Sequence, residues 1–481
     1  MSNKNQAFVK EITPMEEDFA RWYTDVITKT EMVDYAPVKG FMVIRPYGYA
    51  IWEYIVQHLD RRLKETGHQN LYFPLLIPES LLNKEAEHIE GFAPEVAWVT
   101  HGGNKELSER LCIRPTSEAI ICSMYAKWLK SYRDLPYLYN QWCNVVRWEK
   151  TTRPFLRTAE FLWQEGHTLH ADREEAEAET RLILDIYRQL AEQLLAIPVV
   201  AGQKSEKEKF AGAECTYTIE ALMHDSKALQ AGTSHFLGQH FTKAFNICYS
   251  NIDGELANPY HTSWGVTTRL IGAVIMVHGD NRGLVLPPAI APVQAVIIPI
   301  AAHKNPAVLK AARELEKALR PHLRVKLDDD SGFSPGYKFN KWEMKGVPLR
   351  LELGPRDLEK NSITVCRRDT LTKIEVGIEE SAAALPQLLT EIHNNMLNKA
   401  LKRRESNTYT VSSLTELQEK LSDGNGLAKA MWCGCRDCED LIKDRTGATI
   451  RCIPFNQENL GNGCHFCEKP ARHMVYIAKA Y

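Results

Sequence analysis

An arginine and a glutamate stand two positions apart in the segment Arg147-Trp148-Glu149. A guanidinium group binds phosphate through paired hydrogen bonds, and a carboxylate beside it accepts hydrogen bonds from an amine. A strand predicted over 142–148 would place both side chains on one face, because residues two apart in a strand point the same way. Taken alone, the pair also fits an exposed ion pair, which is common and weak. The segment therefore indicates either a phosphate and amine site or a surface salt bridge.

A second arginine, Arg269, stands where a strand predicted to end near Gly265 gives way to an apolar helical run over 270–277. The N-terminus of a helix attracts anions, and an arginine placed there adds a full positive charge. Arg269 therefore predicts a second phosphate contact. The alternative is an arginine that only packs against the first turn.

A hydroxyl and a carboxylate lie close together in Thr116-Ser117-Glu118. Together they can hold an ammonium or imino nitrogen, since both accept hydrogen bonds. The same residues suit the start of a helix, with Thr116 or Ser117 as the cap and Glu118 in the first turn. Both interpretations stay open from these residues alone.

The cysteines are unevenly placed: six of the twelve fall between Cys433 and Cys467. Two close pairs, Cys433 with Cys438 and Cys464 with Cys467, have the spacing of a tetrahedral zinc site. Four thiolates leave no open position, so such a zinc ion would be structural. Three neighbouring side chains are competing ligands: Cys435, Cys452 and His465.

The chain has 481 residues and a net charge of −2, so we expect two or three domains and only local basic patches for any nucleic acid. The first residues lack the apolar core of a signal peptide, and no run approaches about 18 apolar residues. We therefore predict a cytoplasmic protein with no membrane association, whose cysteines are reduced.

Several elements must position these side chains. Helices are predicted over about 49–65, 172–196, 307–319 and 384–402, with strands and loops over 113–170 and 210–276. The apolar run Leu71–Ile77 contains Pro74, which favours a sheet edge and, in a long enzyme, a subunit interface. A small α/β domain is predicted after Leu286, and a cysteine-rich tail after Lys402.

The strand with Pro74, the segment Arg147–Phe161 and the segment Gly265–Arg269 together resemble the three signatures of class II aminoacyl-tRNA synthetases. Five segments narrow the resemblance to the prolyl-tRNA synthetase family of the archaeal or eukaryote-like type. They are Arg-Pro-Thr-Ser-Glu (114–118), Arg-Trp-Glu (147–149), Phe-Leu-Trp-Gln-Glu-Gly-His (161–167), Gln-Ala-Gly-Thr-Ser-His (230–235) and His-Gly-Asp-Asn-Arg-Gly-Leu (278–284). The resemblance covers essentially the whole chain. It implies an α+β fold with three domains: a catalytic domain with an antiparallel sheet flanked by helices (1–286), an α/β anticodon-binding domain (287–402) and a small zinc-binding C-terminal domain (403–481).

The resemblance also implies roles for individual residues. Activation of L-proline by ATP with Mg²⁺, followed by transfer to tRNA(Pro), would use Arg147 and Arg269 as the catalytic pair. The implied ATP contacts are Arg147, Glu149, Arg157, Thr158, Phe161, Gln230, Thr233, Thr267 and Arg269. The implied proline contacts are Phe92, Thr116, Glu118, Arg147, Trp163, Glu165, His167, Phe210 and His235. The implied anticodon contacts are Arg350, Glu352 and Arg356, and the implied ligands of structural Zn²⁺ are Cys433, Cys438, Cys464 and Cys467.

A homodimer is expected from the class, and no editing domain is expected between Glu165 and Thr262. Three alternatives remain. A threonyl or glycyl synthetase is one, although a threonyl enzyme would carry zinc in its catalytic domain. A non-catalytic tRNA-binding sensor or scaffold would be expected to lose Arg147, Glu149 or Arg269. A tRNA-independent ligase would not need residues 287–400.

Overall fold

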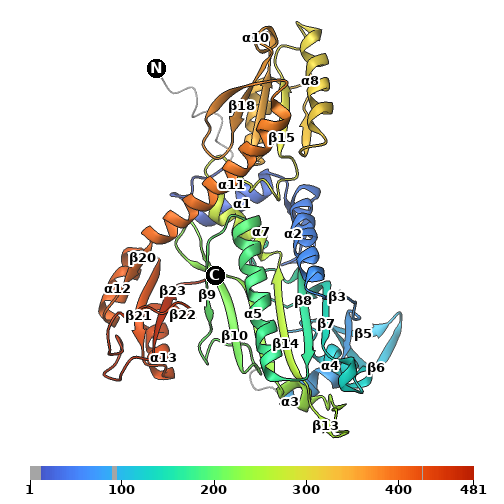
Figure 1. Cartoon of the computed structure of the whole chain (residues 1–481), viewed down its shortest axis with the longest axis vertical. Coiled ribbons are helices and arrows are strands. Elements are labelled where there is room, and N and C mark those ends of the chain that lie inside the picture. Colours follow the sequence, from blue (N-terminus) through green and yellow to red (C-terminus); the bar gives the residue numbers. More distant parts are fainter. Residues whose placement is uncertain (1–11, 89–94, 425) are drawn as a thin grey trace.

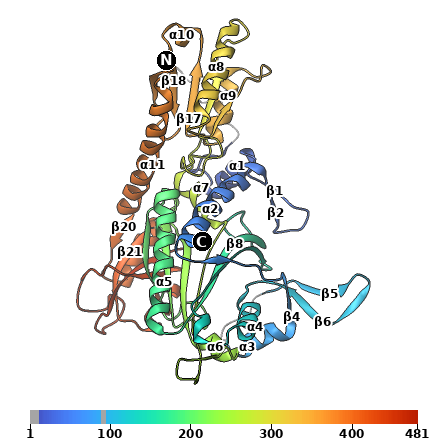
Figure 2. The same ribbon diagram turned by 45° about the vertical axis from the view of Figure 1, so that its right-hand side comes forward.

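The computed structural model describes residues 12–88, 95–424 and 426–481. Figure 1 shows a large sheet with helices in the lower part, a smaller α/β domain above it, and a third group of strands beside the large sheet. The long helix α11 (Ser381–Ser406) runs from the upper domain to the third group, as Figure 2 also shows. No helix in the described residues is both long and apolar enough to cross a membrane.

The part of the large sheet that carries the candidate site is antiparallel, apart from one short parallel edge strand, β3. In spatial order its strands are β9 (Val199–Gln203), β10 (Cys215–Leu222), β11 (Ala228–Gly238), β14 (Tyr260–Thr267), β8 (Glu160–His170), β7 (Tyr137–Val146) and β3 (Gln69–Asn70). Helix α5 (Arg173–Gln189) begins at Asp172, whose carboxylate accepts the Glu175 N–H at 2.7 Å, and it packs across β11 and β14. Helix α5 thereby covers one face of the sheet, and apolar side chains of the helix and of that face form part of the main core.

Shorter elements surround this sheet. Helices α1 and α2 pack into the main core through Trp22, Tyr23, Ile51 and Leu59. The bounds of the remaining elements in this part are α1 (Phe19–Lys29), β1 (Val33–Tyr35), β2 (Met42–Ile44), α2 (Pro46–Glu65), β4 (Leu76–Pro78), α3 (Glu79–His88), β5 (Trp98–Gly102), β6 (Lys105–Ile113), α4 (Glu118–Trp128), η1 (Tyr132–Asp134), η2 (Leu190–Leu194), α6 (His240–Ala244), β12 (Tyr249–Ser250), β13 (Leu256–Ala257) and α7 (Arg269–His278).

The upper domain is a five-stranded mixed sheet with helices against it. Parallel pairing of β15 with β16 and β17, and antiparallel pairing of β17, β18 and β19, give the order β16-β15-β17-β18-β19. Its elements are β15 (Ala295–Pro299), α8 (Pro306–Leu319), β16 (Val325–Leu327), α9 (Pro335–Met344), β17 (Leu349–Leu353), α10 (Pro355–Glu359), β18 (Ser362–Arg367), β19 (Lys373–Gly377) and the first part of α11.

The C-terminal strands continue the large sheet. Ile453 pairs with Gln203 and Pro454 with Gly202, so that β22 extends the sheet beyond β9. A Cβ atom on Gly202 would lie 2.4 Å from the Ile453 carbonyl oxygen, so this close approach requires glycine. The elements are β20 (Thr408–Thr410), α12 (Leu414–Asp423), β21 (Leu427–Trp432), α13 (Arg436–Thr446), β22 (Thr449–Pro454) and β23 (His473–Ala478).

Three predicted elements differ from those found. Strand β7 ends at Val146 and β8 begins at Glu160, so the strand predicted over 142–148 ends two residues earlier and its alternation does not extend to Arg147 and Glu149. The backbone leaves the ladder there, because the Trp148 N–H is bonded to the Glu95 carbonyl. The strand predicted over Leu71–Ile77 is confined to Leu76–Pro78, since Pro74 lacks an N–H and the Phe73 N–H is bonded to the Gln141 side chain. The strand predicted to end near Gly265 continues to Thr267.

Candidate active site and metal centre

One cavity of about 340 Å³ opens over β8, β10, β11 and β14. It is lined by all the predicted ATP and proline contacts except Phe92, which lies outside the described residues. The predicted residues that the structure brings together are Thr116, Glu118, Arg147, Glu149, Arg157, Thr158, Phe161, Trp163, Glu165, His167, Phe210, Gln230, Thr233, His235, Thr267 and Arg269.

Two arginines face this cavity from different elements. Arg147 follows β7, donates from Nε to the Pro115 carbonyl at 3.0 Å, and lies over the Phe161 and Trp163 rings at 5.6 and 5.7 Å. Arg269 is the first residue of α7 and donates from Nε to the Leu156 carbonyl at 3.1 Å. Removal from water lowers the pKa of both guanidinium groups, and the charge of Arg147 lowers the pKa of Arg269 further. Both remain cationic at neutral pH, so an anion between them is strongly favoured.

A second region of the cavity suits a flat, amine-bearing ring. Arg157 holds the Glu149 carboxylate through Nε at 2.8 Å, and the Phe161 ring lies nearby in the cavity wall. The buried hydroxyl of Thr158 has no hydrogen-bond partner within the described structure. A polar group this deep in a protein is normally satisfied, so Thr158 is available to a bound molecule.

The third region combines acidic and aromatic side chains. Thr116 donates to Glu118, and both are buried. Helix α4 begins at Glu118, but the Ser117 hydroxyl donates to Glu165 and does not cap the helix. The helix starts here, as the second interpretation predicts, but neither hydroxyl caps it, because both donate to carboxylates. The binding of a nitrogen by Thr116 and Glu118 stays a prediction.

Glu165 is held by several donors beneath the cavity. Gln141 donates to it at 2.6 Å, Ser117 donates to it, and His167 Nε2 lies 3.2 Å away. Burial opposes the charged carboxylate, but these partners outweigh that effect and the pKa of Glu165 is lowered. Gln141 also accepts the Phe73 N–H at 3.0 Å. A fixed negative charge therefore stands below the aromatic part of the cavity.

His235 lies on the aromatic wall of the same region. Its ring stacks near Phe210 with centroids 4.7 Å apart, and its Nδ1 lies 2.9 Å from the Thr216 hydroxyl. Burial, with a smaller contribution from His167, lowers the pKa of His235 to about 3. His235 is therefore neutral at physiological pH and offers one donor and one acceptor.

Sequence reasoning missed several residues of the site. Ser117 and Gln141 hold Glu165 from below, while Glu208, Thr216 and Ser263 line the cavity directly. Strand alternation could have found Ser263, because it lies two and four residues before Gly265 and Thr267, which share its face of β14. Ser117 lies in the segment Thr116–Glu118, where only a role as a helix cap was predicted for it, and no local pattern points to Gln141, Glu208 or Thr216.

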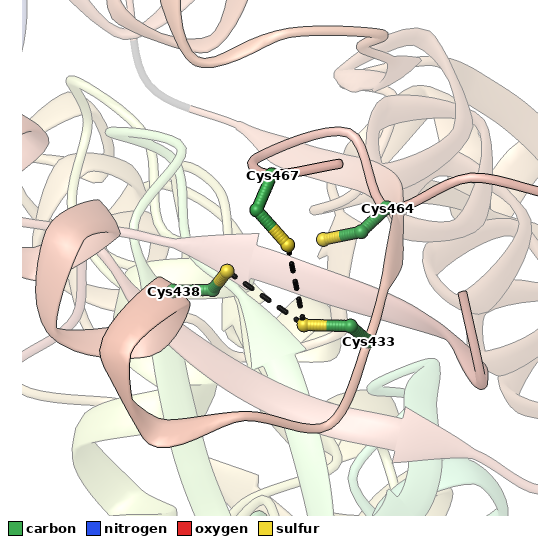
Figure 3. A group of neighbouring side chains, drawn as sticks. All are labelled: Cys433, Cys438, Cys464 and Cys467. Carbon is green, nitrogen blue, oxygen red and sulfur yellow. Dashed lines mark hydrogen bonds between the residues drawn. The ribbon is translucent and has the colours of Figure 1, made fainter. Parts of the chain in front are cut away.

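Four cysteines converge in the C-terminal part, as Figure 3 shows. The Sγ atoms of Cys433, Cys438, Cys464 and Cys467 all lie within 4.8 Å of one another. Cys433 Sγ lies 3.7 Å from the Sγ atoms of Cys438 and Cys467. Zinc–sulfur bonds of about 2.3 Å in a tetrahedron require sulfur atoms about 3.8 Å apart, so the group fits zinc. Of the described residues, Cys452 and His465 are not in this group, and Cys435 Sγ lies 3.1 Å from Cys433 Sγ without belonging to it.

The three predicted anticodon contacts lie close together in the upper domain but differ in exposure. Arg356 is exposed, whereas Glu352 is buried and pairs with Arg350 at 3.0 Å and Lys373 at 2.7 Å. A nucleobase that reached Glu352 would have to displace part of this network.

Comparison with known proteins matches three family models along the chain. Residues 98–278 match the tRNA synthetase class II core domain (G, H, P, S and T), residues 294–388 the anticodon binding domain, and residues 414–481 the prolyl-tRNA synthetase C-terminal domain.

Curated relatives match over the full length. A proline--tRNA ligase of Alkaliphilus oremlandii is 68% identical and one of Acetoanaerobium sticklandii 66% identical, each over 100% of both chains. The crystal structure of prolyl-tRNA synthetase from Cryptosporidium parvum, solved with halofuginone and AMPPNP, superposes with a TM-score of 0.95 at 43% identity, covering 99% of this chain and 100% of that one. With its antiparallel core, cavity residues and cysteine group in place, the chain belongs to the prolyl-tRNA synthetase family of class II aminoacyl-tRNA synthetases.

Proposed function

We propose that the protein activates L-proline with ATP to give prolyl-adenylate and pyrophosphate, and then transfers proline to the 3′ end of tRNA(Pro). The observation that carries the proposal is that Arg147 and Arg269 line the same cavity as the acidic and aromatic residues of its third region. The names of the full-length relatives agree with it. A non-catalytic scaffold is disfavoured, since Arg147, Glu149 and Arg269 all line the cavity.

ATP would enter as its magnesium complex, and the ion would neutralise charge on the phosphates. In this proposal Arg147 and Arg269 contact the α-phosphate, Glu149 accepts from the adenine amine, and Phe161 stacks on the ring. The solved Cryptosporidium parvum relative was crystallised with AMPPNP, which supports nucleotide binding by this fold. Arg157, Thr158, Gln230, Thr233 and Thr267 would complete the ATP contacts.

Proline would lie in the acidic and aromatic region. The Thr116 and Glu118 side chains would hold the ring nitrogen, since both offer oxygen atoms to a cation. Trp163, Phe210 and His167 would enclose the ring, which suits a saturated five-membered group. Phe92 stays a prediction, because it lies outside the described residues.

The proline carboxylate would be the nucleophile, so no protein nucleophile is required. It attacks the α-phosphorus, a new oxygen–phosphorus bond forms, and the bond to pyrophosphate breaks. Negative charge grows on the α-phosphate oxygens during this step, and Arg147 and Arg269 are placed before the reaction begins. Such preorganised charge is usually the largest contribution to catalysis, together with correct positioning.

The other two domains would serve RNA binding and stability. We propose that residues 287–402 bind the anticodon with Arg350, Glu352 and Arg356, and that residues 403–481 hold structural zinc at the four cysteines. The matched family models agree with this division. Tyr72 and Leu76 are exposed in the segment of Pro74, which supports the proposed homodimer interface. The proposed location is the cytoplasm, where charged transfer RNA is used.

The decisive experiment is ATP–pyrophosphate exchange with each of the twenty amino acids, followed by tRNA charging with the best one. Proline should give the fastest exchange, with alanine or cysteine weaker. Exchange led by another amino acid would refute the assignment of Thr116, Glu118 and Trp163. Absence of exchange with all twenty would favour the scaffold.

A further inference from the structure

The segment between β9 and β10, residues 204–214, forms part of the cavity wall without belonging to a helix or strand. It places Glu208 and Phe210 in the lining. The Phe210 N–H donates to the Thr216 hydroxyl at 3.0 Å, and the Phe210 ring lies 4.7 Å from that of His235. The position of this segment therefore sets the shape of the region proposed for the amino acid. We refer to residues 204–214 as the wall segment.

The other side of the wall segment lies against helix α13 of the C-terminal part. The Ser205 hydroxyl donates to the Glu439 carboxylate at 2.6 Å, and both residues are 2% exposed. The same hydroxyl accepts the Glu208 N–H at 3.3 Å, so it ties Glu439 to the turn that presents Glu208. Lys207 forms an ion pair with Asp440, the residue after Glu439.

A buried ion cluster forms a second attachment at the start of the wall segment. Lys204 donates to Glu220 at 2.7 Å, and Arg451 of β22 donates to the other oxygen of Glu220 at 2.9 Å. Lys204 also donates to the Arg451 carbonyl at 2.9 Å. All three residues are at most 7% exposed. Burial of three charges is tolerated only because each is paired and hydrogen-bonded.

The cysteine group fixes the element that makes the first attachment. Cys438 is one of the four convergent cysteines, and Glu439 and Asp440 follow it directly in α13. A metal ion bound at the four thiolates would hold the first turn of α13 in place. Without an ion, four uncompensated thiols would leave that turn less firmly held.

We infer that the C-terminal domain positions the amino-acid side of the cavity through Glu439 and Asp440, with the metal centre as its anchor. Glu439 and Asp440 do not line the cavity, and thus are positioning residues that act through Ser205 and Lys207. The effect on proline rests on the proposed function. The effect on the order of the wall segment does not.

The first experiment compares Glu439→Ala with Glu439→Gln in the full chain, using ATP–pyrophosphate exchange. Alanine removes the acceptor of the Ser205 hydroxyl, whereas glutamine retains an oxygen at the same place. We expect the KM for proline to rise about tenfold in Glu439→Ala, with the KM for ATP within about twofold of wild type, and near-recovery in Glu439→Gln. Glu419→Ala, at an exposed site on α12 of the same domain, is the matched control and should change neither constant.

A double-mutant cycle separates coupling from general damage. Ser205→Ala should raise the KM for proline by a similar factor, and the double variant Ser205→Ala/Glu439→Ala should be no worse than either single variant. Additive losses, or equal rises in the KM values of proline and ATP, would refute positioning through this contact.

Amide hydrogen exchange reports on the wall segment directly, without an activity assay. Amide hydrogen exchange over 204–214 should accelerate in Glu439→Ala and after removal of the metal with a chelator, and should recover when zinc is restored. Unchanged exchange over 204–214 in a metal-depleted but folded chain would overturn the inference. If wild type activates no amino acid but this exchange pattern holds, the proposed function fails and the positioning role stands.

Discussion

Replacement of Arg147 by alanine should abolish most adenylate formation while it leaves the fold intact. Within the described structure, Arg147 uses its Nε for the Pro115 carbonyl, and its guanidinium group lies over the Phe161 and Trp163 rings beside the cavity. The two remaining nitrogen atoms are thus placed to meet a phosphate and a carboxylate. Alanine removes both contacts together with the positive charge.

The size of the effect follows from the contacts that would be lost. A hydrogen bond to a charged group contributes about 1.5–3 kcal/mol, so two of them contribute about 3–6 kcal/mol to the transition state. At about 1.4 kcal/mol per factor of ten, the rate should fall about a hundred- to ten-thousand-fold. Arg147→Lys retains the charge but not the paired geometry, and its loss should be about ten- to a hundredfold.

Stability should change little, for two opposing reasons. The Pro115 carbonyl loses one donor, which costs about 1 kcal/mol. The attraction of Glu118, Glu149 and Glu165 for the Arg147 charge is lost too, but removal of a buried cation relieves its desolvation and its repulsion of Arg269. Arg147 variants should therefore unfold within a few degrees of wild type.

The assay is proline-dependent ATP–pyrophosphate exchange, read as kcat/KM, alongside thermal unfolding of the same samples. Arg61→Ala serves as the control, because Arg61 is an exposed arginine on α2 outside the cavity. Exchange within tenfold of wild type in Arg147→Ala would refute the role assigned to Arg147. A large fall in melting temperature would instead make Arg147 a structural residue.

Three further outcomes are expected. Purified protein should contain one zinc ion per chain by elemental analysis. Cys467→Ser should lower both the zinc content and the melting temperature, whereas Cys435→Ser should change neither, and full zinc retention in Cys467→Ser would contradict the ligand set. Burial lowers the pKa of His278 to about 3, so below pH 6.5 the unfolded chain binds a proton that the folded chain does not, and the free energy of unfolding falls as the pH drops towards 3. Urea unfolding of His278→Gln should lose about 2 kcal/mol less of this free energy between pH 7 and pH 5 than wild type does, and an equal loss would refute this. Alanine should be activated, but with a kcat/KM at least about a hundredfold below that of proline, since each missing methylene contributes about 1–3 kcal/mol; equal values would mean that Trp163 and Phe210 do not enclose the ring.

The family and its core fold could be predicted from the sequence because motifs record chemistry directly. Arg269 lies far along the chain from Arg147 and Glu149, yet each of the three has a residue type that suits a nucleotide, and the structure brings all three to one cavity. The two cysteine pairs likewise indicated their convergence through spacing alone. Such signals can be recognised in the sequence before the fold is known.

Residues that support the site from below gave no such signal. Gln141 bonds to the Phe73 backbone and to Glu165, but its contribution depends on which strands are neighbours. Arg368 lies among other basic residues in the sequence and could pass for part of an RNA-binding surface, yet it is buried and forms two hydrogen bonds with Asp280 at 2.6 and 2.8 Å. A charge count cannot distinguish an arginine that faces solvent from one that joins two domains.

The domain limits proposed from the sequence do not all coincide with breaks in the structure. The limit at 402 lies within α11, and β22 pairs with β9, so the catalytic and C-terminal parts share one continuous sheet. The upper domain joins the catalytic part through backbone bonds such as the Leu284 N–H to the Met344 carbonyl at 2.9 Å, and through side-chain contacts such as Arg368 with Asp280. Helix α11 joins it to the C-terminal part. Backbone pairing resists relative motion more than a few side-chain contacts do, because a ladder must break cooperatively. The metal-bearing part should therefore move with the catalytic sheet as one unit.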